Sequence, residues 1–178
     1  MMQEGFLALK KGGFLAVNID QITGKCYVAK GTFYHVFESK TEFLYQVMLY
    51  KRQEAKDQIL AYLDPQQKLS WDGLYAYLHW LAEENPNIFS YLDGQRTRYL
   101  ISKWPQEYLE NEMNDEQTAR RIISYLKDPK ENANWQLFCN YLKIIALALN
   151  SSEYLLAEAT ETLLDHLIAD ACNCISCR

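Results

Sequence analysis

Residues 13–42 have the sequence GFLAVNIDQITGKCYVAKGTFYHVFESKTE, and this stretch decides the fold of the chain. Gly13 is expected to end a short first helix. Asn18 is placed to cap a second helix, because Asn is among the side chains preferred at the N-cap. A turn at about residues 24–27 leads to a third helix, and residues 39–42 (SKTE) have the spacing of a capping box that starts a fourth. Two short helices joined by a tight turn and braced by flanking helices form a helix-turn-helix.

The third helix is expected to have one apolar and one polar face. Val28, Phe33 and Phe37 recur at helical spacing and form the inward set. The outward set consists of small, basic or hydrogen-bonding side chains, namely Ala29, Lys30, Thr32, Tyr34 and His35. This mixture suits contacts with phosphates and base edges in the DNA major groove. The alternative is a small helical bundle in which these polar residues are ordinary surface.

Residues 6–48 resemble the tetracycline-repressor (TetR) family of bacterial transcriptional regulators. The residues that carry the resemblance are Leu9, Gly13, Ile19, Ile22, Val28, Lys30, Gly31, Thr32, Phe33, Tyr34, His35, Phe37, Ser39, Lys40 and Glu42. The resemblance implies a helix-turn-helix DNA-binding domain followed by a helical ligand-binding and dimerisation domain. It also implies a transcriptional repressor whose affinity for operator DNA is controlled by a small-molecule effector.

The resemblance further implies a set of DNA-contacting residues. In chain order these are Asn18, Lys30, Thr32, Tyr34, His35 and Lys40. Asn18 caps the second helix against a phosphate, and Lys30 and Thr32 lie on the recognition helix. Tyr34 touches the DNA backbone, with His35 beside it, and Lys40 reaches a phosphate from the start of the fourth helix. Tyr27 stands where the family favours Gly, so it is expected to adopt an unfavourable backbone angle.

The rest of the chain is expected to be helical as well. Past residue 40 the apolar residues recur at helical spacing, and no strand-like alternation is longer than a few residues. The fold class is therefore all-α. We predict a DNA-binding domain over residues 1–46, a helical effector-binding and dimerisation domain over residues 47–171, and a cysteine-containing tail over residues 172–178.

The prolines are expected to mark helix boundaries. Asp64-Pro65, Asn85-Pro86 and Asp128-Pro129 each place a side-chain acceptor at an N-cap and a proline at the first helical position. Trp104-Pro105 is expected to interrupt or kink a helix, because proline pushes the preceding residue away from helical angles.

The last two predicted helices, at about residues 132–149 and 152–171, are apolar on more than one face. A helix with such a pattern is buried on two sides. One interpretation is a central core helix pair within a single subunit. The family resemblance implies instead a homodimer formed through these two helices.

Residues 70–126 are dense in aromatic side chains. In the family such a region encloses a pocket for a small effector, and Tyr and Trp offer an apolar wall with a polar tip. The candidate lining residues are His79, Tyr99, Trp104, Tyr108 and Tyr141. The alternative is that most of these rings are core and that His79 is a core histidine.

Cys172, Cys174 and Cys177 have CxC and CxxC spacing near the end of the chain. Thiolates this close could hold zinc or copper(I), or act as a redox switch. They lack an evident fourth ligand, so we expect an unstructured tail and assign no metal and no cofactor.

Composition narrows the class of protein. The chain has 178 residues, of which 49% are hydrophobic and 23% charged, and a net charge of −5. Residues 1–55 hold seven Lys and Arg against five acids, and this excess suggests one surface for an anionic partner. No signal peptide or membrane-spanning run is apparent, and five cysteines fit a reducing compartment, so a cytoplasmic protein without a membrane partner is expected.

No enzymatic activity is expected. The three histidines are scattered, and the chain has no P-loop, GxSxG or HExxH motif. The alternative function is a protein-interaction adaptor, or a thiol or metal sensor, that keeps the fold but binds DNA weakly.

Overall fold

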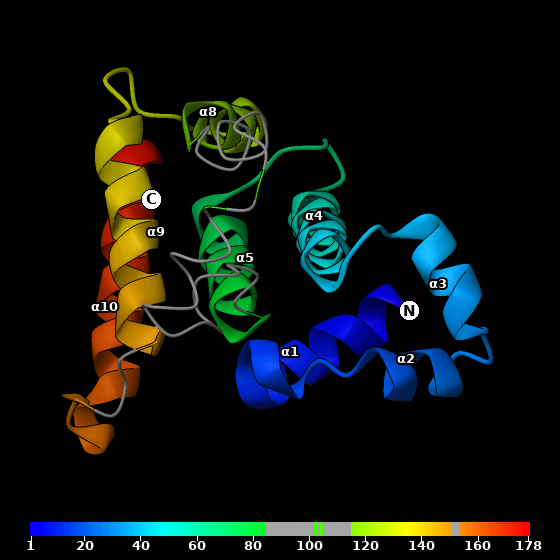
Figure 1. The fold of residues 1–178 in the computed structure, drawn as a ribbon. Coiled ribbons are helices and arrows are strands. Elements are labelled where there is room, and N and C mark those ends of the chain that lie inside the picture. Colours follow the sequence, from blue (N-terminus) through cyan, green and yellow to red (C-terminus); the bar gives the residue numbers. More distant parts are fainter. Residues whose placement is uncertain (85–101, 103, 105–114, 151–153) are drawn as a thin grey trace. The chain divides into compact units, whose positions relative to one another are not determined.

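The computed structural model describes residues 1–84, 102, 104, 115–150 and 154–178. Within these ranges the chain is all helical and forms no strand, which confirms the predicted fold class (Figure 1). The described residues fall into two compact units. The first holds residues 1–54 with Ser102 and Trp104, and the second holds the remaining described residues from Ala55 onward. The predicted domain limits at residues 46 and 171 stay predictions.

Among its described residues the first unit contains four helices, and the last of them runs on into the second unit. They are α1 (Met2–Ala16), α2 (Ile19–Lys25), α3 (Lys30–Val36) and α4 (Lys40–Gln58). The helix that was expected to end at Gly13 is kinked there and makes a further turn to Ala16. Gly13 has φ 65° and ψ −163°, a backbone region that is essentially restricted to glycine.

A group of phenylalanines anchors α3 in the core of the first unit. Phe33 and Phe37 are one helical turn apart, and their ring centroids lie 5.0 Å from each other. Both rings also lie 5.1 Å from the ring of Phe43 on α4. Phe33 and Phe43 are completely buried, so the inward face of α3 is held against α4. The outward face of α3 is left at the surface.

α1 approaches α4 closely at Gly5. A Cβ atom on Gly5 would lie 2.7 Å from the ring of Phe43 and 2.9 Å from a methyl group of Val47. Real Cβ atoms do not come this close to other carbon atoms, so glycine is required at this position for α1 to pack as it does.

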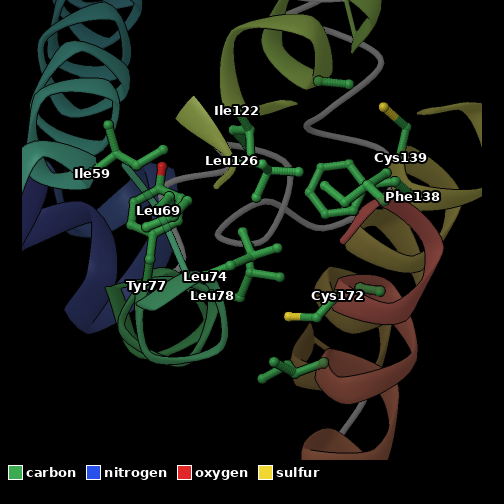
Figure 2. Close-up of a cluster of buried hydrophobic side chains, with 14 of the residues drawn as sticks. Ile59, Leu69, Leu74, Tyr77, Leu78, Ile122, Leu126, Phe138, Cys139 and Cys172 are labelled. Carbon is green, nitrogen blue, oxygen red and sulfur yellow. The ribbon is translucent and has the colours of Figure 1, made fainter. Parts of the chain in front are cut away.

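The second unit begins with the C-terminal end of α4 and contains five further helical elements among its described residues. They are η1 (Ile59–Tyr62), α5 (Trp71–Glu84), α8 (Asp115–Tyr125), α9 (Trp135–Asn150) and α10 (Ala157–Ile175). α9 and α10 run side by side over most of their length, and α5 packs on α10 (Figure 1). Figure 2 shows the core that these helices share, in which Leu74, Leu78, Ile122, Leu126, Phe138 and Cys172 are buried.

Two of the predicted helix starts are wrong. At Asp64 the carboxylate accepts hydrogen bonds from the backbone N–H of Gln66 and Lys68, both at 2.9 Å, and forms a turn without a helix. α5 starts later, where the Oγ of Ser70 accepts from the N–H of Gly73 at 3.0 Å. The same side-chain chemistry stabilises turns and helix starts, so an Asp-Pro pair alone does not distinguish them.

The second wrong helix start is Asp128. The helix that was expected there begins at Trp135, where Asn134 Oδ1 accepts from the N–H of Leu137 at 2.9 Å. Residues 128 and 129 instead belong to a connection in which Pro129 forms an isolated bridge with Ser176. The predicted boundaries at Asn85-Pro86 and Trp104-Pro105 fall on pairs that lie wholly or partly outside the described residues.

The expectation of an unstructured cysteine tail is also wrong. α10 continues to Ile175, and Cys172 and Ile175 are completely buried in the core of the second unit. Ser176 is 1% exposed, and the N–H of Cys177 donates to the carbonyl of Asp128 at 2.9 Å. The end of the chain is therefore part of the folded second unit.

Candidate nucleic-acid interface

The start of α2 is built by Asn18. Its backbone is extended, and its Oδ1 accepts hydrogen bonds from the N–H of Asp20 at 2.9 Å and of Gln21 at 3.2 Å. This confirms the predicted N-cap. Ile19 and Ile22 are buried, as their spacing predicted, and they seat α2 on the core. The side chain of Asn18 is therefore held at the exposed first turn of α2.

The connection from α2 to α3 is a tight turn. The N–H of Cys26 donates to Ile22 O at 3.1 Å, and the N–H of Val28 donates to Thr23 O at 2.9 Å. Tyr27 has φ 55°, which confirms the predicted unfavourable backbone angle. For a residue with a side chain this left-handed conformation costs about 1–2 kcal/mol. The side chain of Tyr27 is 98% exposed.

α3 presents its polar side chains to solvent. The residues of the predicted outward set are all exposed, namely Ala29, Lys30, Thr32, Tyr34 and His35. Tyr34 is 49% exposed, and its ring meets the buried ring of Phe33 edge-on at 5.1 Å. A Cβ atom on Gly31 would meet nothing within 4 Å, so the protein's own packing does not require glycine there. The surface over the start of α3 is open to an approaching partner.

Two lysines of this surface are paired with carboxylates from other helices. Lys30 Nζ lies 2.7 Å from Asp20 Oδ1 on α2, and Lys25 Nζ lies 2.8 Å from Glu4 Oε2 on α1. The hydrogen bond and the charge of Asp20 raise the pKa of Lys30, and those of Glu4 raise the pKa of Lys25. Neither Asp20 nor Glu4 could be predicted as a partner from the sequence, because each ion pair joins two helices and forms only when they pack.

Lys40 is the first residue of α4. Ser39 Oγ accepts from the N–H of Glu42 at 3.0 Å, which is one half of the predicted capping box. The carboxylate of Glu42 accepts from the N–H of Glu38 at 2.6 Å, not from that of Ser39. Lys40 Nζ lies 4.2 Å above the ring of Phe14, and partial burial lowers the pKa of Lys40. The cation–π contact therefore holds the ammonium group of Lys40 against α1.

A groove of about 420 Å³ lies between α1 and α2. The residues that line it are Glu4, Leu7, Ala8, Lys11, Gly12, Ala16, Asn18, Gln21, Ile22 and Lys25. Lys11 and Lys25 border the groove beside the capping residue Asn18. Lys11 was not singled out from the sequence, because its closeness to Asn18 depends on how α1 packs on α2.

The predicted effector residues do not form one described site. Trp104 is buried in the core of the first unit, where its ring lies 5.5 Å from that of Tyr45. His79 and Tyr141 belong to the second unit. His79 Nε2 lies 3.3 Å from Asp165 Oδ1, an ion-pair distance without hydrogen-bond geometry. Tyr99 and Tyr108 lie outside the described residues.

α9 and α10 expose large apolar side chains. On α9 Phe138 and Ile145 are buried, whereas Leu137 and Ile144 are 43% and 47% exposed. Further exposed apolar side chains on or just before these helices are Leu147, Leu156 and Leu163. We call the exposed set, from Leu137 to Leu163, the apolar face of α9 and α10. Large apolar patches at a protein surface mark interaction sites.

The three cysteines near the end of the chain differ in burial: Cys172 is buried, Cys174 is half-buried and Cys177 is exposed. Burial raises the pKa of the Cys172 thiol to about 12. Among the described residues no group of three or more His, Cys, Asp or Glu side chains is placed to hold a metal ion. None of the described helices combines the length and the apolar character that crossing a lipid bilayer requires.

Comparison with known proteins gives a partial match. The chain matches no known family model. It is 37% identical over 82 residues to the Transposon Tn10 TetC protein of Escherichia coli. The matched segment covers 43% of this chain and 40% of that protein, so it spans less than half of either.

Proposed function

We propose that this chain is a DNA-binding transcriptional regulator of the TetR type that represses transcription, and that its affinity for operator DNA is controlled by a small-molecule effector. The observation that carries the proposal is the two-sided character of α3. Phe33 and Phe37 fasten α3 to the core, while Lys30, Thr32 and Tyr34 stand at the surface. A helix that is rigidly held and polar on its outer face is what the major groove accepts. The partial similarity to Tn10 TetC supports the same class.

DNA recognition divides between these residues. Tyr34 and Lys40 are assigned to the phosphate backbone, and Asn18 supports them at the start of α2. Lys30 and Thr32 are assigned to base edges, and His35 adjoins them. Loss of a backbone contact weakens binding to all sequences, whereas loss of a base contact relaxes preference at one position and costs about 1–3 kcal/mol.

The regulator is proposed to act as a homodimer. A single helix-turn-helix contacts few phosphates, and dimers read two half-sites about 34–36 Å apart. The apolar face of α9 and α10 is the surface that we assign to the dimer, because Leu137, Ile144 and Leu163 gain burial there. Effector binding in the second part of the chain would then change the spacing of the two recognition helices. A coupling free energy of about 1–3 kcal/mol between the effector site and the DNA-binding surface changes DNA affinity some 5- to 150-fold.

Selection of bound DNA from a random pool tests this function. The full chain is mixed with random duplexes, bound DNA is sequenced, and the mass of the protein is measured by light scattering. An enriched palindrome together with a dimeric mass supports the proposal. A mixture without enrichment contradicts it.

The second candidate function is a protein-interaction adaptor that keeps this fold and binds DNA weakly. The observation in its favour is that Lys25 and Lys30 both carry a carboxylate partner, which reduces the positive charge that the surface offers to DNA. The selection experiment separates the two candidates, because the adaptor retains its dimeric mass but enriches no sequence.

A further inference from the structure

The ion pair between Lys30 and Asp20 joins α3 to α2. These two helices carry the proposed DNA-reading surface, which consists of Asn18, Lys30, Thr32, Tyr34 and His35. Asp20 lies in the first turn of α2, and Lys30 is the first residue of α3. Their charged atoms are 2.7 Å apart, although the side chain of Lys30 is 56% exposed and that of Asp20 is 64% exposed. An acidic residue on a surface that meets a polyanion is costly, since DNA repels it. The position of Asp20 beside Lys30, the first residue of α3, therefore needs a functional explanation.

The ammonium group of Lys30 has three donor hydrogens. One donates to Asp20, which leaves the others for a second acceptor. Guanine offers two uncharged acceptors, O6 and N7, in the major groove. Lys30 can donate to such a base edge while it still neutralises Asp20. A DNA phosphate is an anion, so a phosphate that binds Lys30 is brought close to the carboxylate of Asp20 and repelled by it.

We propose that Asp20 is a specificity-determining residue that makes Lys30 favour uncharged base acceptors over phosphates and so weakens binding to non-specific DNA. The proposal rests on the DNA-binding function proposed above. Non-specific binding is supplied almost entirely by phosphate contacts. Because Asp20 keeps phosphates from binding Lys30, affinity for non-specific DNA is lowered. The contact between Lys30 and a matching base is kept.

The variant Asp20→Asn removes the charge and keeps the size of the side chain. Binding of the full chain to a random-sequence duplex and to the selected duplex is measured by fluorescence anisotropy between 50 and 200 mM salt. Non-specific affinity is expected to rise about three- to tenfold at 50 mM salt. The slope of log K against log salt is expected to steepen by about 0.9, because Lys30 now neutralises one more phosphate. Affinity for the selected duplex should change less.

Glu4→Gln is the matched control. It changes the net charge by the same amount and releases Lys25 from an ion pair of similar length, 2.8 Å against 2.7 Å, which joins α1 to the last turn of α2. If Asp20 acts only through net charge, both variants shift affinity for the two duplexes equally, and the proposal is refuted. A larger effect of Asp20→Asn on the random duplex than on the selected one supports it.

The double variant with Lys30→Gln tests the pairing itself. In the Lys30→Gln background Asp20→Asn should no longer steepen the salt slope, and an unchanged steepening overturns the proposal. A loss of preference upon Asp20→Asn at a base pair that Lys30→Gln leaves unaffected also overturns it, because Asp20 would then read a base directly. Circular dichroism of each variant checks that the helices are intact. Wild-type protein that binds neither duplex overturns the proposed function together with this role, whereas wild-type binding with equal slopes for all variants overturns only the role of Asp20.

Discussion

Replacing Tyr27 by glycine should stabilise the first unit. Tyr27 has φ 55°, and its side chain is 98% exposed, so the ring contributes almost no buried area to the folded state. Relief of the left-handed conformation yields about 1–2 kcal/mol. The greater freedom of glycine in the unfolded chain costs about 0.5–1 kcal/mol. The difference is a stabilisation of up to about 1.5 kcal/mol, with a central value of about 0.75 kcal/mol.

Urea unfolding, followed by circular dichroism, measures this change. Two variants serve as controls. Tyr27→Ala removes the ring but keeps the Cβ atom that causes the strain, so it should leave the free energy of unfolding nearly unchanged. Gln67→Gly relieves the same kind of strain, since Gln67 has φ 61° in an exposed turn of the second unit. It should raise stability by a similar amount.

A Tyr27→Ala variant that is stabilised as much as Tyr27→Gly would contradict backbone strain as the cause. The exposed ring, not the backbone angle, would then be the source of the strain. A lowered free energy of unfolding in Tyr27→Gly would also contradict backbone strain. If Tyr27→Gly raises stability but weakens DNA binding, the strained tyrosine contributes to the DNA complex.

Three further predictions concern packing, the DNA-reading surface and pH. Gly5→Ala should lower the free energy of unfolding by about 1–3 kcal/mol in urea titrations, because its Cβ would press into Phe43 at 2.7 Å. Gly31→Ala should leave the free energy of unfolding unchanged or slightly raised, since nothing lies within 4 Å of the added Cβ atom. It should weaken binding to the selected duplex, because the added methyl group would lie where DNA approaches α3. Equal binding of Gly31→Ala and wild-type protein to that duplex would contradict a close approach of DNA at Gly31. Stability should be steady from pH 7 to about 9 and fall between about pH 9 and 12. The folded state holds the protons of Cys172 and Tyr77, whose pKa values are both about 12, whereas the unfolded state loses them from their ordinary values of 9.0 and 10.0 upward. The fall should be smaller for Cys172→Ala, and an equal fall would remove Cys172 from the explanation.

Local patterns predicted the parts of the fold that depend on neighbouring residues. The cap at Asn18, the burial of Phe33 and Phe37 and the strained angle at Tyr27 follow from chain spacing within one or two helical turns, and the structure has all three. Val28, the third member of the predicted inward set, precedes α3 and is only partly buried. At Asp64 and Asp128 the local sequence pattern predicted helix starts that the structure does not have. Each side chain can stabilise a turn or a helix start, and the outcome depends on which following residues are buried by the rest of the protein.

The exposed polar face of α3 and the helical class of the chain were determined by the sequence alone, because apolar periodicity selects which side of a helix turns inward. Only the tertiary structure decided the partners of the charged side chains and the burial of Cys172. Asp20 and Lys30 come within 2.7 Å because α2 and α3 cross, and Cys172 is buried because α10 packs on α9. Such contacts join residues that are distant along the chain, so they depend on the angle and register at which whole helices pack.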